Sequence, residues 1–233
     1  MSVFPHLFYF NFRRILSLAR VHILMLLMLV VMAFFFGHVS GASPDPAHMG
    51  AVVSMFCGNF LVFNSLMMVF MISENVFFME KSGRIMESVF SAPVGHGVVA
   101  LSKTAALSLT AWAYPVLVLG AVLAVYGSGV LAAVSVPHLV LIVAVLPVLL
   151  FAVTLMTGLF LLLARDIRVK NIVTSAVLFA VMGLSKKVMA VSKTAGFLPI
   201  VYAYAAVAVL FLLLAAVMYK TVYTKAAVLS TSY

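Results

Sequence analysis

Apolar runs long enough to cross a lipid bilayer dominate this sequence. The first of them covers residues 21–39 almost without interruption, and a bilayer-spanning helix needs about 20 apolar residues. The chain is 66% hydrophobic and 8% charged, whereas soluble domains are roughly 45–50% apolar and about 25% charged. A chain of 233 residues has too much surface to hide so many apolar side chains from water. We therefore expect an all-α integral membrane protein.

Six apolar runs are candidate transmembrane spans. They lie at residues 21–39, 51–73, 104–126, 138–164, 172–184 and 197–219. Pro147 falls inside the fourth run, where it would kink the helix. The longest polar segment separates the second run from the third and holds Glu74, His96 and Lys103. The pattern predicts one membrane domain, with an N-terminal segment 1–20, a six-span bundle 21–219 and a tail 220–233.

The N-terminal segment has the pattern of an amphipathic helix. Arg13 and Arg14 fall among apolar residues that recur at helical spacing. These apolar residues are Phe4, Leu7, Phe8, Phe12, Ile15 and Leu16. The pattern predicts a separate helix that lies on the membrane surface. The alternative is a simple extension of the first span.

The basic residues predict a cytoplasmic N-terminus. The chain has 14 Lys and Arg against 5 Asp and Glu, for a net charge of +9, and such an excess concentrates in cytoplasmic loops. With six crossings, every basic residue is cytoplasmic except Lys186, Lys187 and Lys193. We expect a multi-pass protein of the cell membrane with both termini in the cytoplasm.

The short run at 172–184 leaves two topologies open. In the first, the run crosses the membrane and its helix continues past the three lysines at the outer interface. We prefer this topology because long lysine stems can reach the interface. In the second, the run is re-entrant, and the tail then lies outside.

The motifs of several enzyme classes are absent. The sequence contains no H-E-x-x-H, no G-x-S-x-G and no phosphate-binding G-x-x-x-x-G-K-[ST] motif. The predicted spans also lack the charged side chains that an ion-coupled carrier needs. We therefore expect a non-enzyme whose energy, if it transports, comes from another chain. His38, Asp45 and His48 share the first outer loop, and we interpret them as loop polarity rather than a metal site.

A few polar residues inside the spans and near the outer surface are candidate site residues. Asn59, Asn64, Thr154 and Thr157 would hydrogen-bond between helices or line a pathway, and helix packing is the default. Lys186, Lys187 and Lys193 would contact an anionic cargo or headgroup at an exit, or anchor the chain at the interface.

The charged segment 80–94 carries the most specific pattern. Glu80 and Glu87 are two helical turns apart and share a face, and Arg84 can pair with both. Pro93 would end the helix. The segment therefore predicts a short, stiff helix beneath the membrane. It could seat in a groove of a soluble partner and carry the partner's movement into the spans, or it could be a solvated connector.

This segment resembles the loop between the second and third spans of ABC-type-2 permeases. The matching residues, in order and spacing, are Glu80, Gly83, Glu87, Ala92-Pro93 and Lys103. The six-span layout, the interfacial N-terminal helix and the cytoplasmic termini also match that family. The resemblance implies that segment 80–94 is a coupling helix, which Glu80 and Glu87 orient, in which Gly83 allows a close backbone approach, and which Pro93 ends.

The resemblance implies the permease subunit of an ATP-binding-cassette exporter. Its implied partners are two cytoplasmic ATPase subunits, which bind ATP and magnesium, and a second permease chain. No cofactor on this chain itself and no nucleic acid partner are expected. Two other functions remain open: a membrane scaffold that docks a soluble partner without transport, and an ATP-independent carrier or channel.

Overall fold

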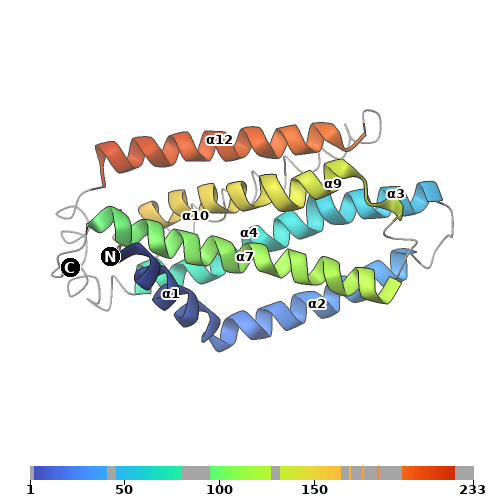
Figure 1. Ribbon diagram of the computed structural model, residues 1–233, viewed down its shortest axis with the longest axis horizontal. Helices are drawn as coiled ribbons and strands as arrows, with labels where there is room; N and C mark the ends of the chain where they lie inside the picture. Colours follow the sequence, from blue (N-terminus) through green and yellow to red (C-terminus); the bar gives the residue numbers. More distant parts are fainter. Residues whose placement is uncertain are drawn as a thin grey trace.

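The structure is an elongated bundle of helices. This computed structural model describes residues 3–40, 46–79, 95–126, 132–163 and 196–223, together with Arg168, Ser175 and Gly183. Its elements are α1 (Val3–Leu16), α2 (Ala19–Ser40), α3 (Pro46–Met55), η1 (Phe56–Leu61), α4 (Val62–Ser73), η2 (Glu74–Phe78), α7 (His96–Tyr126), α9 (Val136–Val140), η3 (Leu141–Val145), α10 (Leu146–Leu163) and α12 (Leu198–Thr221). All lie along the long axis except α1, which is oblique at one end (Figure 1).

Four helices of the described chain are long and apolar enough to cross a membrane. They cover Met49–Phe78, His96–Ala121, Val136–Leu163 and Leu198–Thr221. They coincide with the second, third, fourth and sixth predicted spans, which confirms an all-helical protein of the membrane type. Helix α2 coincides in position with the first predicted span. The fifth, at 172–184, lies outside the described residues apart from Ser175 and Gly183, so the count of six stays a prediction.

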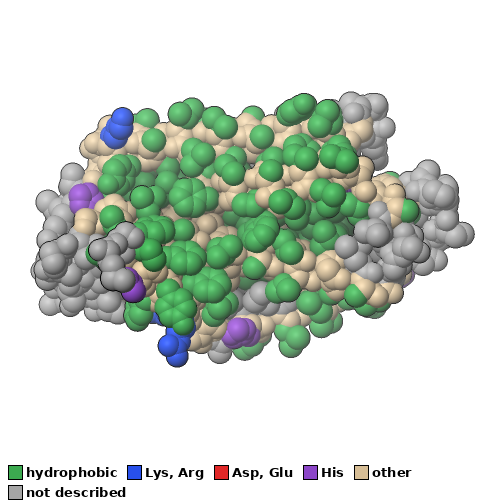
Figure 2. Space-filling model, in the orientation of Figure 1, with side chains coloured by type: hydrophobic (Ala, Val, Ile, Leu, Met, Phe, Trp, Pro, Cys, Tyr) green, Lys and Arg blue, Asp and Glu red, His purple; other side chains and the backbone are tan. Residues whose placement is uncertain are grey.

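Large apolar side chains cover the outside of this bundle. Phe34 of α2 is 77% exposed, and Leu213 of α12 is 61% exposed. Hydrophobic side chains extend over the visible face for most of its length (Figure 2). A soluble protein rarely exposes so continuous an apolar surface, whereas lipid tails are a suitable solvent for it. The distribution therefore agrees with insertion in a bilayer.

The third predicted span begins earlier than expected. The sequence placed its start at residue 104, but α7 begins at His96, so His96 and Lys103 belong to the helix and not to a loop. Ser102 and Lys103 are both buried. The physical reason is that α1 packs along this part of α7, and a helix covered by a neighbour does not need an apolar sequence to stay helical.

Helix α1 is separate from α2. Ser17 and Leu18 interrupt the helices, and the Ser17 hydroxyl donates to the carbonyl of Arg14 over 2.7 Å. Leu7, Phe8 and Phe12 pack against the bundle core, and Ile15 is fully buried. Part of the predicted apolar face of α1 therefore packs against other helices. The position of α1 at a membrane surface stays a prediction.

The helix that ends with α10 and the helix α12 run in the same direction. Phe197, at the start of α12, stacks on His138, at the start of the α9–η3–α10 helix, with ring centroids 4.0 Å apart. Helix α12 then lies beside α10 along its length (Figure 1). The two helices are therefore parallel, and the end of α10 and the start of α12 lie at opposite ends of the bundle.

Three π-helical turns interrupt these long helices, and each has a carbonyl group that accepts a hydrogen bond from a neighbouring helix. The Tyr204 hydroxyl donates to Gly58 O in η1 over 2.8 Å. The Lys103 ammonium donates to Val76 O in η2 over 3.2 Å. The Trp112 indole donates to Ile142 O in η3 over 2.9 Å. Since π-helical turns shift the regular backbone pattern, these donors satisfy carbonyl groups that lipid cannot.

The third of these contacts follows directly from a proline. In η3 the Leu146 amide donates to Leu141 O, five residues back. The next donor in this register is residue 147, which is proline and has no N–H. Ile142 O is left without that partner, and the Trp112 indole takes its place.

We predict that Tyr204→Phe destabilises the protein by about 1 kcal/mol, because Gly58 O loses its side-chain donor inside the bundle. Tyr202→Phe is the matched control, since Tyr202 lies on the same helix and is 65% exposed. Thermal or denaturant unfolding in detergent measures the difference. Equal stability of the two variants would contradict the role given to the Tyr204 hydroxyl.

Candidate coupling site at the basic end of the bundle

The strongest sequence-predicted site residues belong to segment 80–94, which follows η2 and precedes α7 along the chain. Glu80, Gly83, Arg84, Glu87 and Pro93 fall outside the described residues, as do Lys186, Lys187 and Lys193. The structure describes both flanks of segment 80–94, which are Met79 after η2 and Gly95 before α7. We call the end of the bundle that contains Arg14, Lys103 and Lys220 the basic end, and both flanks lie there.

Lys103 connects the two flanks. The sequence analysis placed it in the polar segment between two spans, but its side chain is only 3% exposed. Its ammonium donates to Val76 O in η2 and lies 6.0 Å from the centroid of the Phe77 ring. The carbonyl end of a helix carries partial negative charge, which stabilises a cation there. A buried charge needs such partners, and Lys103 thereby fixes α7 against the end of η2.

A glycine on α10 lets a third helix join this contact. The Phe77 ring packs directly on Gly158, and a Cβ atom at Gly158 would lie 2.6 Å from Phe77 Cζ. No side chain larger than hydrogen fits there unless the ring moves. The close approach therefore holds η2 against α10 as well as against α7.

Helix α1 is held to the same region by a buried polar pair. The Asn11 amide donates to Ser102 Oγ over 3.2 Å, and the Ser102 hydroxyl donates to Val99 O over 2.9 Å. Asn11 and Ser102 are both at least nine-tenths buried. The pair fixes the register of α1 on α7, one residue before Lys103.

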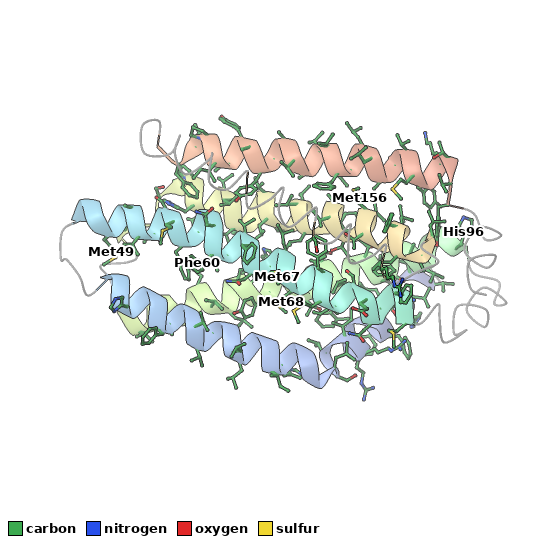
Figure 3. The ribbon with its side chains drawn as sticks, turned by 180° about the vertical axis from the view of Figure 1, so that it is seen from behind. Met49, Phe60, Met67, Met68, His96 and Met156 are labelled. Atoms are coloured by element: carbon green, nitrogen blue, oxygen red, sulfur yellow. The ribbon has the colours of Figure 1, made fainter. Side chains whose placement is uncertain are left out.

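An aromatic cluster ties the end of α12 to the start of α7. His96, labelled at the end of the bundle in Figure 3, lies beside Tyr219 and Tyr223, with ring centroids 6.3 and 5.3 Å away. The Tyr223 hydroxyl donates to His96 O over 3.4 Å. Burial, and secondarily the charge of Tyr219, raises the pKa of Tyr223, so this donor keeps its proton at neutral pH. The Tyr219 hydroxyl closely approaches Gly97.

These contacts make the two flanks of segment 80–94 part of the packed bundle. The flank at η2 is held by Lys103 and Gly158, and the flank at α7 is held by the tyrosines of α12. Packed helices move as rigid units rather than deforming continuously. A displacement of either flank would therefore be felt by the helices packed against it.

Helix packing or a pathway was expected for four polar residues of the spans, and these roles stay predictions. Asn59 Oδ1 and Thr154 Oγ1 are buried and have no hydrogen-bond partner among the described residues. Asn64 and Thr157 are partly exposed. Tyr204, Trp112 and Lys103 make bonds between helices. The signal that could have revealed two of them is a tyrosine and a tryptophan inside apolar runs, because buried rings of these types need a partner for their polar atom.

A second polar cluster lies at the opposite end. The Ser135 amide donates to His138 Nδ1 over 3.1 Å, which leaves the ring proton on Nε2, 3.1 Å from Ser54 Oγ. The Ser54 hydroxyl donates to Gly50 O over 2.8 Å. With its proton on Nε2, His138 donates to Ser54 Oγ. The cluster joins α3 to the start of α9.

Metal ligation finds no support within the described ranges, where no group of three His, Cys, Asp or Glu side chains could hold an ion. His38 is exposed near the end of α2, and Asp45 lies outside the described residues.

The comparisons add no relative: no family model, no curated protein and no solved structure matches this chain.

We predict that Lys103→Met loosens the basic end, because Val76 O loses its donor while the apolar stem is kept. The loss of a buried partner costs about 1–3 kcal/mol. Amide hydrogen exchange should become faster in η2 and in the first turns of α7. Lys220→Met is the control, since Lys220 is exposed in the last turn of α12, and it should leave the exchange unchanged. Equal exchange in both variants would show that Lys103 does not hold η2.

Proposed function

We propose that this chain is the membrane-spanning permease subunit of an ATP-binding-cassette exporter. The observation that carries the proposal is the position of Lys103. It is the basic residue at the end of the pattern that resembles ABC-type-2 permeases, and its ammonium binds the helix that precedes segment 80–94. A segment that receives a push from a soluble motor needs rigid flanks, and the contacts of Lys103 supply one.

The direction of the helices supports the six-span topology. Helix α10 ends at the basic end, and α12 starts at the opposite end. This favours the predicted crossing by residues 172–184 over the re-entrant alternative. Both ends of the chain then lie on the cytoplasmic side, as the positive-inside rule favours.

In the proposed mechanism the chain is the pathway and not the motor. Two ATPase subunits bind ATP with magnesium, and their association pushes on the coupling helix 80–94. Glu80 and Glu87 orient this helix, and Arg84 pairs with both carboxylates. The movement then passes through Lys103 and Phe77 to the bundle, and the spans alternate between inward-open and outward-open arrangements with a second permease chain.

Copurification tests the assignment. The chain is isolated from its native membrane in mild detergent, and the accompanying proteins are identified. We expect an ATPase with a phosphate-binding G-x-x-x-x-G-K-[ST] motif, whose hydrolysis rate changes when this chain is removed. A stable partner without ATPase activity would favour a scaffold, and cargo flux in vesicles that contain this chain alone would favour a carrier or channel.

We predict that Glu87→Ala reduces the coupling of ATP hydrolysis to this chain and leaves membrane insertion intact, because the coupling helix loses one of its two orienting carboxylates. Coupling is measured as the hydrolysis rate of the reconstituted complex relative to that of the isolated ATPase subunits. Lys220→Ala changes a charge at the same end outside the segment and should have no effect. A Glu87→Ala complex with the wild-type ratio would argue against the coupling role.

A further inference from the structure

Helix α1 meets α2 at a bend that lies at one boundary of the predicted first span. Helix α2 has 22 residues, and a rise of about 1.5 Å per residue gives it a length of about 33 Å. This length is close to the ~30 Å of hydrocarbon in a bilayer. Ser17 and Leu18 separate α2 from α1, which extends obliquely from the bend towards the basic end (Figure 1). With α2 as the first span, α1 lies at the level of the lipid headgroups.

One face of α1 is used for packing on the bundle. Leu7, Phe8 and Phe12 pack against the core, and Ile15 is fully buried. The Asn11 amide donates to Ser102 Oγ of α7. The apolar residues of this face are those from which the sequence predicted a helix on the membrane surface, but they are largely covered by protein. This face is therefore not the one that contacts lipid.

The opposite face of α1 is exposed and combines aromatic with basic side chains. Tyr9 and Phe10 are 64% and 62% exposed. His6 and Arg13, about one turn before and after them, are exposed as well. Since these positions recur every three or four residues, they lie on one side of the helix, which we call the outer face of α1. The sequence of α1 contains no Asp or Glu.

The chemistry of the outer face suits the boundary between hydrocarbon and water. A tyrosine has an apolar ring and a polar tip, and such rings are enriched at the headgroup level of membranes. An arginine can place its apolar stem along hydrocarbon and its charged head among the headgroups. The exposed apolar surface also continues across the bend, where Ile23 and Leu26 of α2 are 68% and 67% exposed. Lipid that covers these residues of α2 would cover the outer face of α1 too.

We propose that the outer face of α1 is embedded in the headgroup layer of the bilayer, while the opposite face holds α1 on α7. The face in contact with lipid is thus not the face that the sequence pattern predicts. The inference does not depend on the proposed transport function. Because Asn11 bonds to Ser102, it places a membrane-embedded helix directly on α7, next to Lys103.

Single-cysteine probes can test which face of α1 contacts lipid. The one cysteine of the chain, Cys57, is fully buried, so an introduced cysteine is the accessible one. Phe10→Cys reports on the outer face and Phe12→Cys on the packed face. Phe34→Cys is the depth control, since Phe34 is 77% exposed on α2 and far from the bend. The full chain is labelled with a bimane fluorophore and reconstituted in phosphatidylcholine vesicles.

Three quenchers report the surroundings of each probe: a nitroxide on the lipid headgroup, a nitroxide in the middle of the acyl chain, and iodide in the water. We expect the Phe10→Cys probe to lose most of its fluorescence to the headgroup nitroxide and little to iodide. The Phe34→Cys probe should lose more to the acyl-chain nitroxide, and the Phe12→Cys probe should be shielded from all three. The comparison of the two exposed positions stands even if Phe12→Cys does not fold.

Three results would overturn the proposal. Strong quenching of the Phe10→Cys probe by iodide would place the outer face in water. Quenching of this probe like that of Phe34→Cys would place α1 within the hydrocarbon. Shielding of the Phe10→Cys probe from all three quenchers would show that protein covers the outer face, and in vesicles of the pure chain this protein would be a second copy.

Discussion

The interaction on which this fold depends is the satisfaction of backbone carbonyl groups where no water can reach them. The long helices are not regular, because η1, η2 and η3 shift the hydrogen-bond register inside them. In each of the three turns a carbonyl group accepts from Tyr204, Lys103 or Trp112 on a neighbouring helix. An unsatisfied group in hydrocarbon costs several kcal/mol, and for Ile142 O, which loses its amide donor to Pro147, the Trp112 indole avoids this cost. The same three bonds also hold the helices together, which couples local backbone irregularity to tertiary packing.

The bond from Lys103 to Val76 O differs from the other two in its location. Lys103 lies at the basic end, where α1, α7 and α10 approach the end of η2 and α12 contacts the start of α7. Glycine at 158 and the tyrosines beside His96 bring these helices close enough to move together. A rigid basic end next to segment 80–94 is what a permease driven from the cytoplasm would need.

Several features could be predicted from the residues, and others could not. Apolar length predicted the membrane helices 51–73, 138–164 and 197–219 to within a few residues, because about 20 apolar residues allow few other solutions. The predicted start of the third span, residue 104, was wrong by eight residues, since α7 begins at His96. The sequence pattern missed the first turns of α7 because they are polar and are covered by α1. Asn59 and Thr154 were expected to bond between helices or to line a pathway, and their buried Oδ1 and Oγ1 atoms have no hydrogen-bond partner among the described residues. Tyr204 and Trp112 do bond between helices; their ring types indicate that they need a partner, but the sequence does not say which one.

The sequence by itself determined that the protein is of the membrane type, the approximate position of four of its long helices and the excess of positive charge, because these depend only on composition and on runs along the chain. Pro147 also determined that one carbonyl in the fourth predicted span would lose its amide donor. Only the tertiary structure decided that Trp112 supplies the replacement and that Lys103 is buried against η2. These pairs are far apart along the chain, and which residues meet depends on how the helices pack. That packing follows from shape complementarity over the whole bundle and not from any local pattern.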